Sequence, residues 1–360
     1  MNRISLLQAQ IQPNEVVLLS TANDISYFTL FEFLVPEERE AFLILTPQLA
    51  YLIVSAFSPT PNAPELTILR GCYPSMVAKH LKQLVSEQKV THLLYQGNSL
   101  YVDELEEIKK NLSTIECSAL PPGFVWKHRM FKDTIEVDYL KEAGRIVTDA
   151  LAEIETFFTV GITELELTSR LATLFAEKGS QQLAFPTIVA FGSHSTLPHH
   201  QPDNTPLLEN TAILIDCGAV VHGYRSDMTR TWWFGKAEND TFLEISQIVK
   251  QAYAQVVDQL RQQDHPPITA KMIDQLARKY ISEAGYGENF IHTTGHGIGL
   301  DIHEPPSLSW SDETEILPGM VITIEPGIYL EDTFGYRYEN TVLITPDGAV
   351  ELTHDSPPTQ

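Results

Sequence analysis

The sequence predicts a two-domain chain of the α/β (α+β) class, on three observations. First, 360 residues are more than one ordinary domain needs. Second, short apolar runs bounded by turn residues dominate residues 1–125, with a helical pattern between them, as in a mixed α/β domain. Third, residues 126–360 twice contain two amphipathic helices followed by a β-hairpin, which indicates two related halves around a shared sheet. The stretch 121–123, Pro-Pro-Gly, interrupts both patterns and marks the predicted boundary.

The smaller N-terminal domain is expected to contain at least four strands and one helix. Its strand candidates are apolar and bounded by turn residues, which is typical of buried strands. The helix candidate repeats its apolar residues at helical spacing and begins with a proline. The predicted strands are 15–20, 41–46, 50–57 and 91–97, and the predicted helix is 74–88.

Two helix pairs are predicted in the second domain. Residues 134–158 place apolar side chains on one helical stripe. The next helix opens with Thr163 and Glu166, which form the pattern of a capping box, and it stops at Gly179. The second pair repeats the layout, with helices that begin near Asp240 and Thr269 and a stop at Gly285.

The first hairpin carries two carboxylates that we expect on one face. Asp216 interrupts an apolar strand, where a charge is costly unless it is paired or bound to a metal. A two-residue turn at 222–223 would place Asp216 opposite Thr229. Since side chains alternate faces along a strand, Asp227 then shares that face with Asp216. Cys217 points to the other face and is expected to pack in the core.

The second hairpin repeats this arrangement. Glu325 follows the apolar run 320–324, and Glu339 lies on the return strand. A loop of odd length, such as 331–335, puts both carboxylates on one face.

Four carboxylates that face one interior repel one another, so we expect one or two divalent metal ions to hold them together. His296, which lies between glycines and between the two hairpins in sequence, would supply a nitrogen ligand. Taken singly, each carboxylate fits a surface ion pair equally well, and His296 fits a hydrogen-bonded core histidine. The combination of two same-face pairs with a glycine-flanked histidine favours a metal site.

Several of these segments resemble one known superfamily, that of creatinase, prolidase, aminopeptidase P and methionine aminopeptidase. The matching pieces are "FPTIVAFGSHSTLPHH", "LIDCGAVVHGYRSDMTRT", "GHGIGLDIHEPPSL", "LPGMVITIEPGIYL" and "GYRYENTVLIT". The resemblance covers residues 126–360 and extends weakly into 1–125. It implies a pita-bread catalytic domain preceded by a creatinase-like N-terminal domain.

The resemblance also implies a role for each candidate ligand. Asp216 is similar to the terminal ligand of one metal ion, and Asp227 and Glu339 are similar to bridging ligands. His296 and Glu325 resemble the terminal ligands of a second ion. All five are present, which argues against the metal-free creatinase branch.

Further residues match positions beside the metal ions. His199 and His303 resemble two histidines that contact the substrate and the tetrahedral intermediate in proline-specific members, and His199 matches better than its neighbour His200. Thr229 and Arg337 match positions that support the metal ligands.

The implied activity is hydrolysis of the bond before a proline, whose nitrogen carries no hydrogen. Glu325 would act as general base and then as general acid, and His199 or His303 would stabilise the oxyanion. We expect an Xaa-Pro aminopeptidase, which acts on peptides with proline second, because Ser307 stands where some dipeptidases carry an arginine. The alternatives are an Xaa-Pro dipeptidase, a non-catalytic family member and a metal-free creatinase-like hydrolase.

Composition limits the partners and the compartment. The net charge of −23 argues against nucleic acid and anionic membranes, and no apolar run is long enough to span a membrane. Three scattered cysteines and the lack of a secretory signal indicate a cytoplasmic protein. An oxygen-rich ligand set with one imidazole suits Mn²⁺, and Co²⁺, Zn²⁺ or Fe²⁺ could occupy it. By resemblance we also expect a homodimer.

Overall fold

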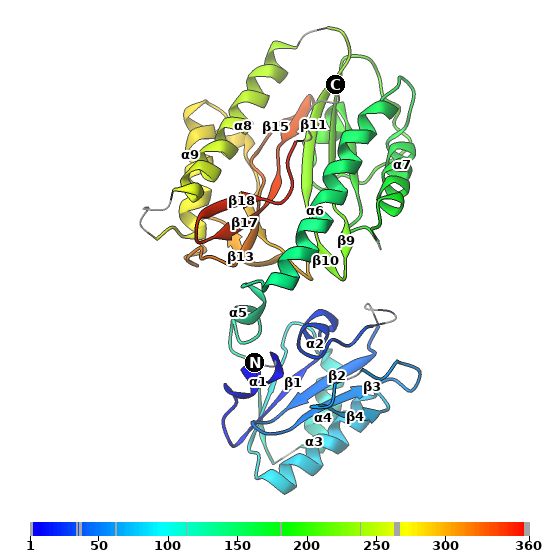
Figure 1. Cartoon of the computed structure of the whole chain (residues 1–360), viewed down its shortest axis with the longest axis vertical. Coiled ribbons are helices and arrows are strands. Elements are labelled where there is room, and N and C mark those ends of the chain that lie inside the picture. The colour runs from blue at the N-terminus through cyan, green and yellow to red at the C-terminus, as the bar shows by residue number, and fades with distance from the viewer. Residues whose placement is uncertain are drawn as a thin grey trace. The chain divides into compact units, whose positions relative to one another are not determined.

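A computed structural model describes residues 3–33, 35, 38–61, 63–112, 114–180, 182–237, 239–262 and 267–355. The chain forms two compact units, Met1–Lys127 and His128–Gln360 (Figure 1). Both contain helices and strands, which confirms the predicted α/β class.

The first unit is built on a six-stranded mixed sheet in the order β4-β3-β2-β1-β5-β6. All four predicted strands are present. Two further strands, β4 and β6, were not predicted, because their side chains are exposed or only partly buried and form no long apolar run. The strands are β1 (Glu15–Leu19), β2 (Ala41–Leu45), β3 (Ala50–Val54), β4 (Thr67–Arg70), β5 (His92–Tyr95) and β6 (Glu116–Ala119).

The predicted helix of this unit, α3 (Pro74–Gln88), has the predicted ends. Its residues Val77, Leu81 and Leu84 are buried and pack with the sheet in one apolar cluster. The other helices are α1 (Arg3–Gln8), α2 (Ala22–Thr29), α4 (Val102–Asn111) and α5 (Trp126–Arg129), the last of which crosses the unit boundary.

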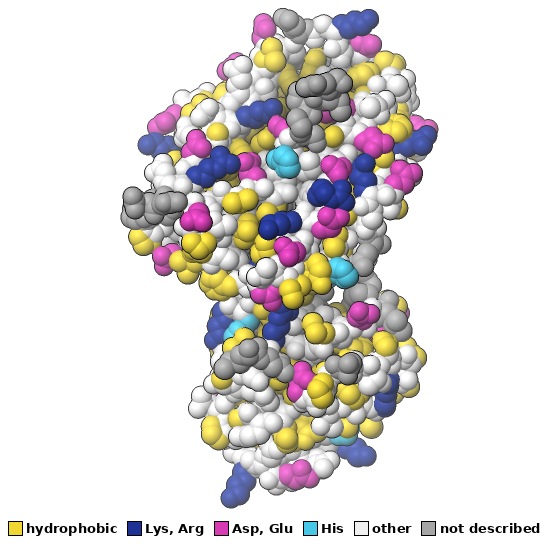
Figure 2. All heavy atoms as spheres, viewed as in Figure 1, with side chains coloured by type: hydrophobic (Ala, Val, Ile, Leu, Met, Phe, Trp, Pro, Cys, Tyr) yellow, Lys and Arg dark blue, Asp and Glu magenta, His cyan; other side chains and the backbone are white. Residues whose placement is uncertain are grey.

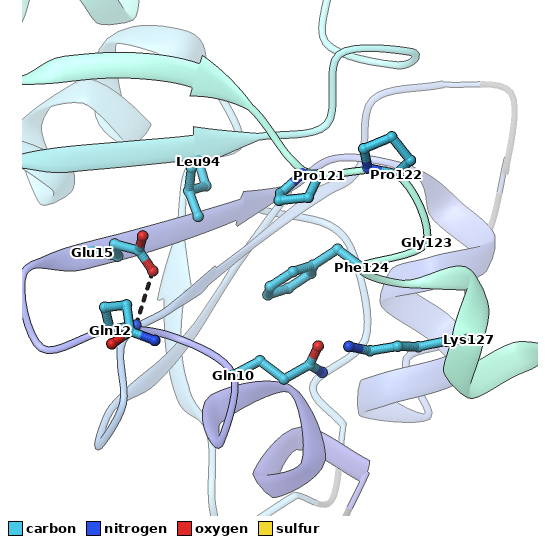
Figure 3. A pocket seen from close by; sticks show the side chains of 9 residues that line it. All are labelled: Gln10, Gln12, Glu15, Leu94, Pro121, Pro122, Gly123, Phe124 and Lys127. Atoms are coloured by element: carbon cyan, nitrogen blue, oxygen red, sulfur yellow. Dashed lines mark hydrogen bonds between the residues drawn. The ribbon is translucent and has the colours of Figure 1, made fainter.

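A surface hollow of about 400 Å³ lies within the first unit (Figure 3). Leu94 and Phe124 line its apolar part, and Lys127 lies at its rim. Its one acidic lining residue, Glu15, accepts a hydrogen bond from the backbone of Gln12 (2.8 Å). The residues that line this hollow therefore include no converging set of metal-binding groups.

The four long helices of the second unit begin where the sequence predicts. Asp133, Thr163, Asn239 and Thr269 occupy the N-cap positions, and each side chain accepts a hydrogen bond from a backbone N–H of the first turn. The first helix ends at Ile154, earlier than the predicted residue 158, and a 3₁₀ turn follows it. The helices are α6 (Thr134–Ile154), α7 (Glu164–Glu177), α8 (Asp240–Arg261) and α9 (Ala270–Glu283).

The strands of this unit lie between the two helix pairs (Figure 1). Their sheet orders are β11-β8-β7 and β13-β12-β14-β17-β18, with two short ribbons, β9-β10 and β15-β16. The bounds are β7 (Ile188–Phe191), β8 (Thr211–Cys217), β9 (Val220–Val221), β10 (Tyr224–Arg225), β11 (Met228–Phe234), β12 (Gly295–Gly297), β13 (Glu304–Leu308), β14 (Val321–Ile324), β15 (Gly327–Leu330), β16 (Phe334–Arg337), β17 (Asn340–Thr345) and β18 (Gly348–Glu351).

Each half has its own apolar core. The predicted shared sheet is wrong, because the described strands β11-β8-β7 and β13-β12-β14-β17-β18 form separate sheets, one in each half. Val147 of α6 packs in one cluster with Ile213 of β8. Val249 of α8 packs in the other with Ile322 of β14. Cys217 is fully buried in the first cluster, which confirms its predicted packing role.

The first hairpin turns as predicted. His222 and Gly223 both have positive φ (49° and 83°), and Tyr224 pairs with Val221 across this two-residue turn. Thr229 consequently pairs with Asp216.

In the second hairpin, the predicted loop 331–335 is wrong. Leu330 pairs with Phe334, so the loop is only the three residues 331–333. Asp332 adopts positive φ (57°), which closes this shorter turn, and the buried Phe334 extends the return strand. The loop still has an odd number of residues, so Glu325 and Glu339 lie on the same face of the hairpin, as predicted.

The exposed charges are intermixed. On the face shown in Figure 2, Lys and Arg side chains lie among Asp and Glu side chains rather than in one patch. None of the described helices combines the length and the apolar character needed to cross a membrane.

Candidate metal centre

The five predicted ligands lie at or beside strand ends of the second unit. Asp216 is the penultimate residue of β8, Asp227 directly precedes β11, and His296 is the middle residue of β12. Glu325 follows β14 and Glu339 precedes β17, whose register pairs Ile324 with Asn340. Because the β15–β16 ribbon continues that register, Glu325 and Glu339 stand opposite each other.

These residues converge on one cavity of about 660 Å³. His296 Nε2 lies 3.6 Å from Asp227 Oδ2 and 3.6 Å from Glu325 Oε1. Donor atoms of Asp227, His296 and Glu339 lie within 4.8 Å of one another. Asp216 lines the same cavity. The structure thus brings all five side chains together from distant parts of the chain.

The imidazole of His296 is oriented for ligation. Its Nδ1 lies 3.0 Å from the carbonyl oxygen of Gly297, so the hydrogen on Nδ1 is donated there and the lone pair of Nε2 faces the carboxylates. The glycines on either side are required by the backbone. A Cβ on Gly295 would lie 2.1 Å from the carbonyl oxygen of Thr323, and a Cβ on Gly297 would lie 2.3 Å from that of Pro305.

Burial and mutual repulsion perturb the carboxyl groups. Burial, followed by the charges of neighbouring carboxylates, raises the pKa of Asp227 and of Glu339 well above the usual range. Burial likewise raises the pKa of Glu325 to about 8, against the opposing effect of Arg337. Of the described residues that line the cavity, Arg337 is the one Lys or Arg, whereas six are acidic: the four candidate carboxylate ligands together with Glu304 and Asp312.

The hydrogen bonding of the carboxylate oxygens shows whether the site fits metal ions. Asp216 Oδ1, Asp227 Oδ1 and Glu339 Oε1 are buried and have no hydrogen-bond partner among the described residues. Buried polar atoms without partners are rare and costly in folded proteins. Carboxylate oxygens together with one imidazole are suitable ligands for divalent transition metals. The residues therefore fit one or two divalent ions.

Thr229 and Arg337 connect these carboxylates to the surrounding strands. Thr229 Oγ1 donates to Glu339 Oε2 (2.6 Å), and Arg337 Nε donates to Thr229 Oγ1 (3.0 Å). Arg337 also donates to Asp216 Oδ2 (2.6 Å) and to the hydroxyl of Tyr329 (2.7 Å). These contacts fix the orientation of Asp216 and Glu339.

The two further predicted histidines line the cavity. The ring of His303 lies 4.4 Å from that of His296, and burial together with nearby His199 lowers the pKa of His303. His200, by contrast, places its Nε2 2.8 Å from Glu164. The structure thus separates the roles of the adjacent residues His199 and His200.

One cavity-lining histidine was not predicted. His292 Nε2 lies 2.8 Å from the hydroxyl of Tyr329, and its Nδ1 lies 3.9 Å from Glu325 Oε2. Burial and then the charge of Arg337 lower the pKa of His292 to about 3, so its imidazole is neutral. The sequence did contain a signal for His292, which lies four residues before His296. In an extended segment, residues an even number apart have side chains on the same face, so His292 could have been expected to face the same cavity as His296.

Glu304 also lines the cavity, yet it differs from the four candidate ligands. Its carboxylate contacts the buried cations Arg129 (2.5 Å) and Lys132 (3.1 Å). Although burial alone would raise the pKa of Glu304, Lys132 and Arg129 lower it overall. Glu304 is therefore neutralised by the protein itself and needs no metal ion.

Metal-free protein is expected to lose stability as pH rises. The folded protein holds the proton of Glu325 more tightly than the unfolded chain does. The contribution of protonated Glu325 to the stability of the folded state therefore declines between about pH 4.5 and about pH 8. Divalent metal ions should reverse this trend, because binding requires the deprotonated carboxylates. Melting temperatures measured from pH 5 to 8, with chelator and with Mn²⁺, check the expectation. If the melting temperature changed with pH in the same way with chelator and with Mn²⁺, the expectation would be contradicted.

Comparison with known proteins identifies similar sequences. The sequence model of metallopeptidase family M24 matches residues 138–346. An Xaa-Pro dipeptidase of Pyrococcus furiosus is 35% identical over 307 residues, which cover 84% of this chain and 86% of that protein.

Solved structures of similar proteins match almost the whole chain. One is an Xaa-Pro dipeptidase from Bacillus anthracis, with a TM-score of 0.87, 29% identity and coverage of 99% and 98% of the two chains. Another is an X-Pro aminopeptidase from Thermotoga maritima, with a TM-score of 0.84, 26% identity and coverage of 99% and 97%. These matches confirm the predicted fold, a pita-bread catalytic domain with a smaller N-terminal α/β domain.

Proposed function

The chain belongs to metallopeptidase family M24, and we propose that it hydrolyses Xaa-Pro dipeptides in a reaction that requires two divalent metal ions. The observation that carries this proposal is the cluster of Asp216, Asp227, His296, Glu325 and Glu339 around three unpartnered carboxylate oxygens. Relatives named Xaa-Pro dipeptidase support the dipeptide substrate and favour it over the longer peptides that we expected from sequence.

When bound, the ions would polarise the substrate carbonyl and make a water molecule more acidic. Asp216, Asp227, His296, Glu325 and Glu339 would hold them. Glu325 would also accept a proton from the attacking water and pass it to the prolyl nitrogen, which has no hydrogen of its own.

The remaining cavity residues would bind and orient the substrate. His199 and His303 would donate hydrogen bonds to the carbonyl oxygen as negative charge develops on it. The apolar side chains of Phe185, Ile302 and Pro305 line the same cavity and suit the ring of proline.

A second candidate activity, that of an Xaa-Pro aminopeptidase, is favoured by the lining of the cavity. A dipeptide presents its free carboxylate immediately after the proline ring, where a cation would stabilise it. Among the described lining residues, the guanidinium of Arg337 is held by Asp216, and Ser307 offers only a hydroxyl. An uncharged peptide bond at this place would need no cation.

Cleavage of Ala-Pro compared with Ala-Pro-Ala, each with Mn²⁺ and with EDTA, tests the proposal. We expect cleavage of Ala-Pro at the higher kcat/KM and loss of activity with EDTA. Preference for Ala-Pro-Ala would establish the aminopeptidase activity instead. Cleavage that persists after metal removal, or no cleavage of either peptide, would contradict the metal-dependent activity.

The identity of the ions, the oligomeric state and the compartment are part of the same proposal. The oxygen-rich ligand set supports Mn²⁺. The resemblance to dimeric family members supports a homodimer. Free Cys72, Cys117 and Cys217 support a reducing compartment such as the cytoplasm.

A further inference from the structure

Glu164, at the start of α7, lies outside the metal centre and is fully buried. Its Oε1 accepts hydrogen bonds from the backbone N–H of Phe191 (2.9 Å) and from His194 Nδ1 (3.0 Å). Its Oε2 accepts from His200 Nε2 (2.8 Å) and from the backbone N–H of Asp203 (3.0 Å). All four donors belong to one segment, 191–203.

This segment forms one wall of the catalytic cavity. Pro198, His199 and Gln201 line the cavity, and the donors to Glu164 lie on both sides of them in sequence. A further contact joins the segment to β16, since Ser195 Oγ accepts a hydrogen bond from the backbone N–H of Gly335 (2.8 Å). One buried carboxylate therefore holds both ends of the stretch that carries His199.

The cluster of Glu164, His194 and His200 also resembles a metal site, because three donor atoms lie within 4.8 Å of one another. Its hydrogen bonding argues for a different role. Each oxygen of Glu164 already has two donors, whereas Asp227 and Glu339 each retain a buried oxygen without a partner. The cluster is satisfied without an ion.

We propose that Glu164 is a positioning residue that acts through His199, by holding segment 191–203 against the cavity. This inference rests on the proposed function, in which His199 contacts the substrate carbonyl. Catalytic groups must be held within about 0.5 Å of the productive geometry. A misplacement of about 1 Å can lower the rate about 10²-fold.

The first test replaces Glu164 by Gln. An amide keeps one acceptor oxygen but presents N–H groups at the other position, so at least the backbone contact of Phe191 or of Asp203 is lost. We expect kcat/KM to fall about 10- to 100-fold, mainly through kcat, with unchanged metal content. Glu166→Gln is the matched control, because Glu166 lies in the same helical turn and, among the described residues, its carboxylate accepts hydrogen bonds only from Thr163 in the capping box. It should leave kcat/KM unchanged.

A double-mutant cycle separates positioning from general destabilisation. If Glu164 acts through His199, then E164Q/H199A has the activity of H199A alone. Independent effects that multiply would overturn the proposal. If E164Q does not fold, His194→Ala provides the second variant, because that side chain is partly exposed and its loss removes one donor. The same non-additivity with H199A is expected.

Hydrogen exchange of the metal-loaded protein supplies a readout that does not depend on activity. E164Q should raise the rate of amide hydrogen exchange in segment 191–203 and leave the rate in α8 and α9 unchanged. This result is expected even if the wild-type protein cleaves no Xaa-Pro peptide, so the test is independent of the proposed function. Unchanged exchange in 191–203 would overturn the positioning role. So would an additional equivalent of Zn²⁺ bound by wild-type protein and lost in both E164Q and H194A.

Discussion

Asp227→Asn is expected to lower kcat/KM at least about 10³-fold and to remove bound metal. The substitution preserves the shape of the side chain and removes the charge of a buried carboxylate that faces His296 and Glu339. The loss corresponds to the several kcal/mol of charge stabilisation that a catalytic metal ion supplies. Kinetics on Ala-Pro and metal analysis of the purified protein measure the two effects.

The same substitution should not destabilise the metal-free protein. Asp227 is buried beside other acidic groups, which raise its pKa, so its charge opposes folding when no cation is bound. A chelator-treated D227N protein should melt no lower than chelator-treated wild type. Asp149→Asn, on the surface of α6, is the matched control and should retain metal and activity. A D227N enzyme with full metal content and normal kinetics would contradict the assignment.

Arg337→Met is expected to lower the free energy of unfolding of the metal-free protein by about 3–5 kcal/mol. Arg337 is buried and bonds to Asp216, Thr229 and Tyr329. Methionine retains much of the volume but leaves Asp216 without its buried cation.

Urea unfolding of wild type, R337M and Arg337→Lys at pH 7 tests this expectation. Lysine keeps the charge, but its three N–H groups lie on one atom and cannot replace the three separate guanidinium nitrogens that reach Asp216, Thr229 and Tyr329, so its effect should be intermediate. Arg145→Met, on an exposed face of α6, should cost less than about 1 kcal/mol. An R337M protein as stable as wild type would show that Arg337 does not balance the carboxylates.

The ligand pairing could be predicted from sequence where local chemistry fixes the strand register. His222 and Gly223 form a two-residue turn, and side-chain alternation then determines which face Asp216 and Asp227 share. Glu325 and Glu339 share a face whenever the loop between their strands has an odd number of residues. The error in the predicted loop length therefore did not affect this part of the prediction. Capping residues such as Thr163 located helix starts equally well.

Other features depend on contacts that no local pattern encodes. Lys132 neutralises Glu304, although the two residues are far apart in sequence. His292 joins the cavity through Tyr329, whose hydroxyl also binds Arg337. Strand β6, with the sequence ECSA, has no apolar run and pairs with β5 only within the assembled sheet.

Anomalous diffraction from crystals grown with Mn²⁺ tests the central claim most directly. We expect two anomalous peaks among Asp216, Asp227, His296, Glu325 and Glu339, with the carboxylate oxygens that lack protein partners among the ligating atoms. Density without an ion at this position, or the five side chains neutralised by lysine or arginine, would contradict it.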